Sequence, residues 1–277
     1  MLKKILVCLE GSASAEAATR TSIALARAHK ARLTGLAIID EPDVQAGDPT
    51  ARSGPVFERE AALLAEARKQ AQDTLALFER RCREAAVPAR ALEAVGRPTD
   101  AILAEIDAHD LTVFGKAADF RFETEATNPQ AREAILHRAK QPVLLVPEAV
   151  EPKLGRIVLI AYDGSSAAKR ALKSFAGSGL ARSREVHVAT VDDNGARAWD
   201  MANRAVEMLA AAHIEARPHN VVSALSNVDA LFVLANQLGA GLMVMGAFPH
   251  SRFKQFFSGS ATRGLLEKAT MPLYLQH

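Results

Sequence analysis

The chain has 277 residues, of which 49% are hydrophobic and 24% are charged, and its formal net charge is +2. This length exceeds that of a usual single domain and the composition is typical of soluble globular proteins, so we expect two domains. The nearly balanced charge gives no reason to expect a nucleic-acid partner or an electrostatic hold on a membrane. No apolar run has the length needed to span a bilayer, so we expect no membrane segment.

The N-terminal residues and the two cysteines indicate the cellular compartment in which the protein is expected. Residues 1–9 hold an apolar run that is too short for a signal-peptide core, and no small-residue cleavage site follows it, which favours a first strand. Cys8 falls in a strand pattern and Cys82 in a helical one, which predicts buried thiols rather than a disulfide framework. We therefore expect a cytoplasmic protein.

Three sequence blocks occur twice in the same order, which indicates an internal duplication. In the first pair, an apolar run is followed by an acid, Glu10 or Asp163, and then by Gly-Ser and an alanine-rich helical pattern. The matching blocks are residues 5–12 with 157–165, residues 111–115 with 242–246, and residues 140–146 with 270–275. The separation between matching blocks shrinks along the chain, so one copy carries extra residues.

The domain boundaries follow from the duplication. The extra residues lie at 41–55, where Pro, Gly and Asp predict a loop. Residues 147–155 have the composition of a linker. We therefore expect one domain at residues 1–150 and a second at residues 151–277.

Within each copy, short apolar runs alternate with longer helical patterns. Strands are predicted near residues 3–9, 32–39, 90–95, 111–115 and 143–146, with helices near 13–30, 57–86, 98–108 and 130–139. In the second copy, strands are predicted near 156–162, 185–191, 216–222, 241–246 and 272–276, with helices near 166–180, 195–213, 226–239 and 259–269. Successive apolar residues in the strands indicate a parallel sheet covered on both faces. The alternation predicts two doubly wound α/β domains, whose ligands bind at the carboxyl ends of the strands.

Two loops of the second copy carry candidate binding residues. Strand one ends at Asp163 and Gly164, and strand four ends at Gly246, from which the chain runs to Gly259 and Ser260 at an expected helix start. Free backbone N–H groups and the positive dipole end of a helix attract anions there. Glycine lets the backbone approach a phosphate, and a serine hydroxyl caps the helix or donates to a phosphate oxygen.

Basic side chains follow strand four in the same loop. His250, Arg252 and Lys254 add hydrogen-bond donors or positive charge along it. Beside them Phe253, Phe256 and Phe257 fit a lid, an ordinary amphipathic turn or a partner surface equally well.

These features resemble the universal stress protein family, whose ATP-binding members carry an Asp after strand one and Gly-x2-Gly-x9-Gly-Ser/Thr after strand four. The spacing of Gly246, Gly259 and Ser260 matches this pattern, with Pro249 in place of the second glycine. The resemblance covers essentially the whole chain. It implies, for each copy, a five-stranded parallel sheet in the order 3-2-1-4-5 flanked by helices, as in adenine nucleotide α-hydrolase-like folds. It also implies that the last strands of the two copies pair in an internal pseudo-dimer.

The same resemblance implies an adenine nucleotide, ATP with or without Mg²⁺, as the ligand of the second copy. Asp163 would lie near the ribose or a water-held metal ion, and the backbone around Val191 would meet the adenine. The glycines and the serine of the strand-four motif would line the phosphate path. The candidate binding residues are Asp163, Gly164, Val191, Gly246, His250, Arg252, Gly259 and Ser260.

The first copy departs from this pattern. Its acid is the longer Glu10, no second glycine follows Gly115, and residues 128–130 read Asn-Pro-Gln where Gly-Ser is expected. Negative charge where phosphates would lie comes from Asp119, Glu123 and Glu125. We therefore expect no ATP binding of this kind in the first copy, while Lys116 and Arg121 are candidates for a different anion.

Three functions remain open at this point. The first is a stress-response factor that binds a nucleotide; the second is a weak ATPase or nucleotide hydrolase, although no clear general base or serine-centred triad is found. For each of the functions, an internal pseudo-dimer is expected and a homodimer stays open. The third function is a scaffold for an unknown protein partner, with both nucleotide sites defunct. This third function is favoured by the Phe256–Phe257 pair and by Pro249, which lacks an N–H and fixes φ near about −65°. Taken alone, residues 163–165 also fit a plain turn and helix cap, and no histidine spacing indicates a metal site.

Overall fold

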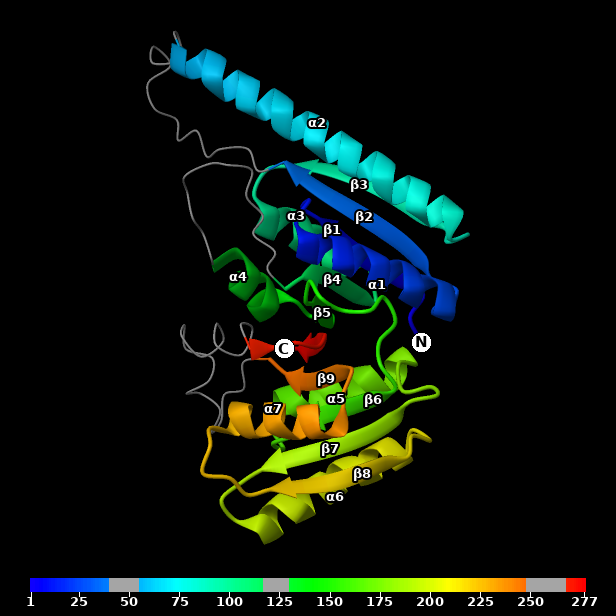
Figure 1. Ribbon diagram of the computed structural model, residues 1–277, viewed down its shortest axis with the longest axis vertical. Coiled ribbons are helices and arrows are strands. Elements are labelled where there is room, and N and C mark those ends of the chain that lie inside the picture. The colour runs from blue at the N-terminus through cyan, green and yellow to red at the C-terminus, as the bar shows by residue number, and fades with distance from the viewer. Residues whose placement is uncertain (40–54, 117–129, 248–267) are drawn as a thin grey trace.

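The computed structural model describes residues 1–39, 55–116, 130–247 and 268–277 (Figure 1). Of the loop predicted at residues 41–55, only Pro55 falls in the described part, and it begins a helix. The helix predicted near residues 259–269 lies, up to residue 267, outside the described part.

The first copy alternates strands and helices as expected. Its strands are β1 (Lys4–Leu9), β2 (Arg32–Ile39), β3 (Ala89–Val95), β4 (Leu111–Gly115) and β5 (Val143–Val146). Its helices are α1 (Ala13–His29), α2 (Pro55–Glu84), α3 (Pro98–Ile106) and α4 (Gln130–Arg138). Each predicted element of this copy is present, and the observed bounds differ from the predicted ones by a few residues at most.

The second copy repeats this order. Its strands are β6 (Ile157–Ala161), β7 (Glu185–Val191), β8 (Ala216–Val221), β9 (Leu242–Gly246) and β10 (Leu273–Gln276). Its described helices are α5 (Ser166–Ser178), α6 (Gly195–Ala210) and α7 (Asn227–Leu238). Serine side chains start three of the helices, because Ser12, Ser165 and Ser226 each accept a hydrogen bond from a backbone N–H three residues on.

The described strands form one ten-stranded sheet in the order β3-β2-β1-β4-β5-β10-β9-β6-β7-β8. Every neighbouring pair is parallel except β5 and β10, which run antiparallel with Leu144 opposite Tyr274. Each copy therefore has the strand order 3-2-1-4-5, and the last strands of the two copies pair at the centre of the molecule (Figure 1). The expected fold class and strand pairing are confirmed.

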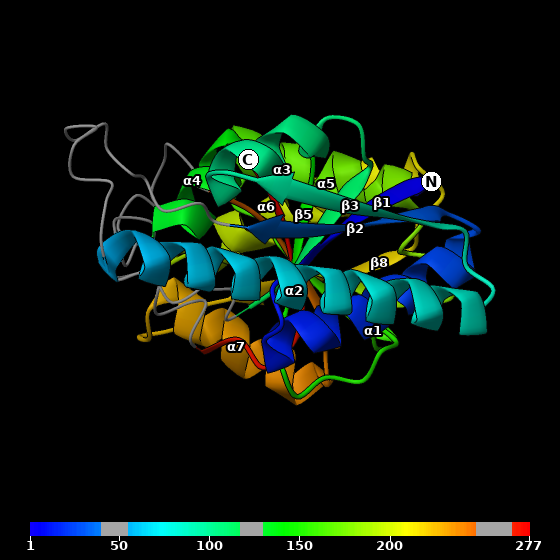
Figure 2. The same cartoon turned by 90° about the horizontal axis from the view of Figure 1, so that it is seen from above.

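Helices cover both faces of this sheet, as seen from above in Figure 2. Apolar residues of α1, α2, α5 and α6 pack on one face, and those of α3, α4 and α7 on the other. The inner strands are buried along nearly their whole length, whereas the edge strands β3 and β8 are partly exposed. This burial explains why the inner strands are apolar at successive positions.

Several contacts hold the two copies together besides the strand pairing. The backbone N–H of Leu2 donates to the carbonyl of Ser178 at 3.0 Å, which ties the first copy to the end of α5. The side-chain amide of Gln276 donates to the carbonyl of Lys140 at 2.7 Å. Because these bonds span the duplication, we expect the two copies to unfold as one unit.

Both cysteines are buried and unbonded, as their sequence patterns predict. Burial raises the pKa of the Cys8 thiol well above its ordinary value, and the pKa of Cys82 to about 11. The thiolate is the reactive form, so both thiols are inert near neutral pH.

Candidate functional site

The turn that follows β6 is built from Asp163, Gly164 and Ser165. Gly164 has a φ of +74°, a left-handed conformation that glycine adopts without steric cost. The backbone N–H of Ser165 donates to Asp163 Oδ1 at 2.9 Å, and the Ser165 hydroxyl accepts from the Ala168 N–H at 3.1 Å to cap α5. The interpretation as a turn and helix cap is thus correct for these residues, and it accounts for one oxygen of Asp163.

The second carboxylate oxygen of Asp163 has no such partner. In the part of the chain that the structure describes, Oδ2 is buried and accepts no hydrogen bond. A buried acceptor left without a donor costs about 1–3 kcal/mol, and more when it is charged. The site therefore needs a donor or a cation at this oxygen, such as a hydroxyl group, a water molecule or a metal-bound water.

A cavity of about 570 Å³ opens beside this turn, at the carboxyl ends of β6 and β7. It lies where a doubly wound sheet places its ligands. Three of the residues predicted for the nucleotide, Asp163, Gly164 and Val191, line it together. The other described lining residues are Ser165, Thr190, Asp192, Asp193, Arg197, Met201 and Asn227.

An ion-paired cluster follows β7 at the rim of this cavity. Arg197 donates through Nε to Asp192 Oδ2 at 2.7 Å, through Nη2 to Asp192 Oδ1, and through Nη2 to Asp193 Oδ1 at 2.7 Å. The hydrogen bond from Arg197 and that from the Asn194 N–H hold the pKa of Asp192 far below its usual range. The pair stabilises the fold above the unfolded pKa of about 3.9, and this contribution is lost as the pH falls toward the lowered value.

Sequence reasoning missed this cluster. Asp192 and Asp193 directly follow Val191, the predicted carboxyl end of the second strand of this copy. Because the carboxyl ends of parallel strands meet at one edge, their position next to the candidate site could have been predicted. The partner, Arg197, comes from the first turn of α6, and no sequence spacing indicated that it would bind both acids.

Gly246 does not line this cavity in the described residues. A Cβ atom on Gly246 would lie 2.5 Å from the backbone nitrogen of Ala168, so β9 packs directly against the first turn of α5. Gly115 makes the equivalent contact in the first copy, where a Cβ would lie 2.6 Å from the nitrogen of Ala15. Because both copies share the contact, it explains the glycine at the end of strand four by packing alone.

The rest of the predicted site falls in the segment between β9 and β10. His250, Arg252, Gly259 and Ser260, together with Pro249, lie outside the described residues. The same holds for Arg121 of the first copy.

The corresponding turn of the first copy makes different hydrogen bonds. Gly11 has a φ of +79° and Ser12 caps α1, as in the second copy. Here, however, the Ser12 hydroxyl donates to Glu10 Oε1 at 2.7 Å, a bond that the Asp163 turn lacks. The ammonium group of Lys116 donates a hydrogen bond to the carbonyl of Ala269 in the second copy at 2.9 Å. This candidate anion ligand therefore contributes to the contact between the copies.

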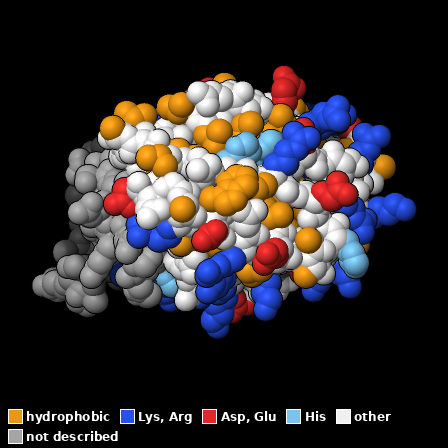
Figure 3. All heavy atoms as spheres, turned by 90° about the horizontal axis from the view of Figure 1, so that it is seen from below, with side chains coloured by type: hydrophobic (Ala, Val, Ile, Leu, Met, Phe, Trp, Pro, Cys, Tyr) orange, Lys and Arg blue, Asp and Glu red, His pale blue; other side chains and the backbone are white. Residues whose placement is uncertain are grey.

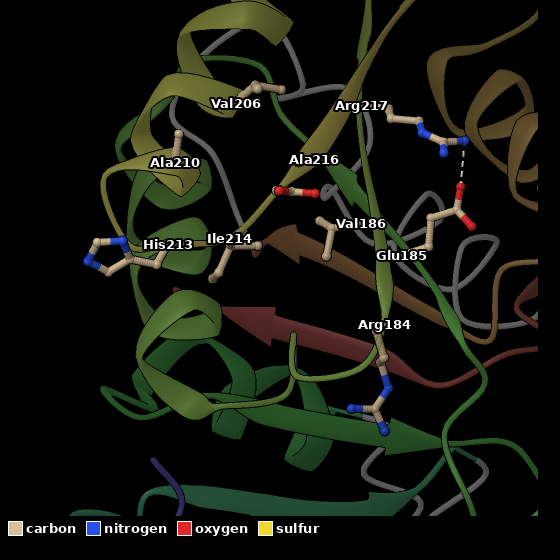
Figure 4. A pocket seen from close by; sticks show the side chains of 10 residues that line it. Arg184, Glu185, Val186, Val206, Ala210, His213, Ile214, Ala216 and Arg217 are labelled. Atoms are coloured by element: carbon tan, nitrogen blue, oxygen red, sulfur yellow. Dashed lines mark ion pairs between the residues drawn. The ribbon is translucent and has the colours of Figure 1, made fainter.

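A second cavity, of about 680 Å³, lies at the opposite edge of the sheet, where β7 and β8 begin (Figure 4). Its walls combine apolar side chains, such as Val186, Val206 and Ile214, with charged ones, among which Glu185 and Arg217 form an ion pair. Its position at the amino ends of the strands separates it from the Asp163 turn. Doubly wound sheets do not place their ligands at this edge.

No group of three or more His, Cys, Asp and Glu side chains is arranged to hold a metal ion among residues 1–39, 55–116, 130–247 and 268–277. In the same residues, no helix combines the length and hydropathy that crossing a membrane requires.

Comparison with known proteins identifies the family. A model described as "Universal stress protein family" matches this chain twice, over residues 1–147 and 155–276. The chain belongs to the universal stress protein family, and it carries the family domain in tandem. Among curated proteins, Universal stress protein Slr1230 of Synechocystis is 26% identical over 166 residues. That alignment covers 59% of this chain and 56%, or about half, of the relative.

A solved structure of similar length agrees with the fold. A universal stress protein from Archaeoglobus fulgidus is 18% identical, with a TM-score of 0.73, over 99% of this chain and 95% of that one. At this identity the likeness shows the fold alone. A second protein from the same organism, solved in complex with dAMP, is 24% identical over 44% of this chain and 98% of its own length, with a TM-score of 0.35.

Proposed function

We propose that this tandem universal stress protein is a cytoplasmic stress-response factor whose second copy binds an adenine nucleotide, ATP with or without Mg²⁺. The observation that carries the proposal is the buried Oδ2 of Asp163, which has no donor among the described residues and lies beside a cavity of about 570 Å³. A ribose hydroxyl or a metal-bound water supplies the donor that this oxygen needs. The backbone around Val191 is then available to the base.

The charges around the cavity favour different places for the nucleoside and for the phosphates of the proposed ligand. Three carboxylates, Asp163, Asp192 and Asp193, line the described part, and its single guanidinium, Arg197, is held by two of them. A polyphosphate would be repelled there, whereas a nucleoside with its hydroxyl and amino donors would be accepted. We therefore assign the nucleoside to the described end and the phosphates to the loop after β9, with its His250, Arg252, Gly259 and Ser260.

Isothermal titration calorimetry tests this proposal. The wild-type chain is expected to bind ATP, in the presence or absence of Mg²⁺, at one site per chain. Asp163→Ala should weaken binding at least tenfold, because it removes the acceptor for the ribose or the metal-bound water; a hydrogen bond to a charged group contributes about 1.5–3 kcal/mol.

Glu10→Ala is the matched control, because Glu10 occupies the equivalent turn of the first copy. This variant should bind ATP as the wild type does. The absence of binding at millimolar ATP would refute the proposal, and an equal loss in both variants would contradict the assignment to the second copy. The probe dAMP, the ligand of the Archaeoglobus fulgidus relative, tests whether an adenine nucleotide with one phosphate and no 2′-hydroxyl supports binding.

A scaffold function is the second candidate, and exposed apolar side chains favour it. Trp199, Val222 and Leu225 are 46%, 60% and 53% exposed, and all three lie in the second copy. Large exposed apolar groups indicate a partner surface when they are contiguous. A chain that binds no nucleotide in the titration above would leave this candidate as the better account.

A further inference from the structure

Two histidines form a direct hydrogen bond between the last two strands of the second copy. His187 on β7 and His219 on β8 face each other with 2.7 Å between Nδ1 of the former and Nε2 of the latter. His187 is almost wholly buried, at 3% exposure, while His219 is half-buried at the edge of the sheet. Figure 3, the view from below, shows histidine side chains lying beside basic ones on this surface.

The geometry of the pair indicates a shared proton rather than a shared metal ion. The ring centroids are 5.0 Å apart, and the facing nitrogens are 2.7 Å apart. The centroid distance equals the nitrogen–nitrogen distance plus the distance from each ring centre to its own nitrogen. The two nitrogens therefore point at each other along the line between the rings. A chelated ion would need both lone pairs to converge on a third point to one side of that line.

The neighbours of the pair decide where its protons lie. Nε2 of His187 lies 3.2 Å from Glu185 Oε1, and the same carboxylate oxygen pairs with Arg217 at 2.6 Å (Figure 4). A carboxylate only accepts hydrogen bonds, so Nε2 of His187 carries a proton. When His187 is neutral its Nδ1 is bare, and Nε2 of His219 must donate to it.

We propose that His187 and His219 form an acid-sensitive clasp that holds the edge strand β8 to β7, and that this clasp accommodates one extra proton but not two. One extra proton on the outer nitrogen of His219 leaves the hydrogen bond between the rings intact. A second extra proton puts hydrogen on both facing nitrogens, so the bond is replaced by a clash between two cations. The clasp then opens, and β8, which among the described strands pairs with β7 alone, loses this attachment.

The surroundings oppose the doubly charged state. Burial, then His187, and then Arg217 lower the pKa of His219 below its ordinary value. Glu185 on β7 is the one carboxylate among the described residues in contact with the pair, and its charge is shared with Arg217. The helix on this face, α7, carries Asp229, which is engaged by Lys268 and Ser226.

The stability that the histidine pair contributes decreases as the pH falls. A histidine whose folded pKa is lowered stabilises the fold above its unfolded pKa of about 6.5, and this stability is lost as the pH falls through the folded value. Below the folded value the closed clasp already holds its one extra proton, and the opened state, which accommodates two, binds one proton more. Each proton that only the opened state binds raises the equilibrium constant for opening about tenfold for every unit by which the pH falls.

Hydrogen exchange of the β8 amides, with NMR detection of the histidine rings, tests the clasp in the full-length chain. The protection factors of Arg217 and Val221, whose backbone N–H groups point toward β7, should fall about tenfold for each unit by which the pH falls below the lowered pKa of His219. At pH 7.5 the ring spectra should show one proton on Nε2 of His187 and one on Nε2 of His219. Ring spectra in which both histidines take up a proton near pH 6.5, with unchanged protection of β8, would overturn the proposal.

Two variants separate the clasp from general acid sensitivity. His219→Gln keeps an N–H donor toward His187 but cannot gain a proton, so its β8 protection should lose the acid-dependent fall. His213→Asn alters an exposed histidine at a left-handed position that asparagine tolerates, and it should behave as the wild type does. The same acid-dependent fall in His219→Gln and wild type would contradict the clasp, and the wild-type ring spectra decide the matter if His219→Gln does not fold.

Discussion

Replacing Gly246 by alanine should destabilise the chain by about 3 kcal/mol, because overpacking against backbone cannot be relieved by a rotamer change. The added Cβ would lie 2.5 Å from the nitrogen of Ala168 and 2.6 Å from the carbonyl carbon of Ala167. To accept it, β9 and α5 must move apart. Urea unfolding followed by the fluorescence of Trp199, the single tryptophan, measures the loss.

The matched control is Gly177→Ala in α5. A Cβ at Gly177 meets no atom within 4 Å, and alanine has the higher helix propensity. This variant should be neutral or stabilised by about 0.5–1 kcal/mol. If Gly246→Ala proved as stable as Gly177→Ala, the close approach of strand four to the first helix would not exist in solution, and the glycine would need another explanation.

Replacing Phe175 by alanine should cost about 3–5 kcal/mol, the usual range for a fully buried aromatic residue. Phe175 has no exposed surface, and its ring meets that of Tyr274 edge-on at 6.1 Å. Tyr274 lies on β10, the strand that pairs with the first copy. The loss should therefore shift the unfolding of both copies together.

Two probes check that cooperativity. Circular dichroism reports both copies, whereas Trp199 on α6 reports the second copy alone. The two unfolding transitions should coincide in the wild type and in Phe175→Ala, as in a two-state protein. Val233→Ala, at a side chain that is 45% exposed, should change stability by about 0.5 kcal/mol or less. Separate transitions for the two probes would show that the ten-stranded sheet is not one cooperative unit.

Much of the fold could be predicted because its signals are local. Buried strands with apolar residues on both faces, such as Leu242–Gly246, are distinct from the helices beside them. Serine caps mark helix starts, and Gly164 marks a left-handed turn. The antiparallel pairing of β5 with β10 has no such local signal. It was expected from the family resemblance, since nothing in the two apolar strands specifies their partner.

The site could be predicted only in part, for physical reasons. Asp163 and Val191 meet at one cavity because parallel strands bring their carboxyl ends together. The ion pairs of Arg197 depend on how α6 begins, and the role of Lys116 depends on the second copy lying beside the first. Gly246 fitted a phosphate motif, yet its described surroundings are those of a packing contact that the first copy shares at Gly115.

Native mass spectrometry of the full-length chain incubated with ATP tests the central proposal most directly, because it counts bound nucleotides per chain. One nucleotide per chain is expected, with an occupancy that falls in Asp163→Ala and is kept in Glu10→Ala. Two nucleotides per wild-type chain would contradict the assignment to the second copy alone. A chain that stays free of nucleotide at millimolar ATP would contradict nucleotide binding altogether.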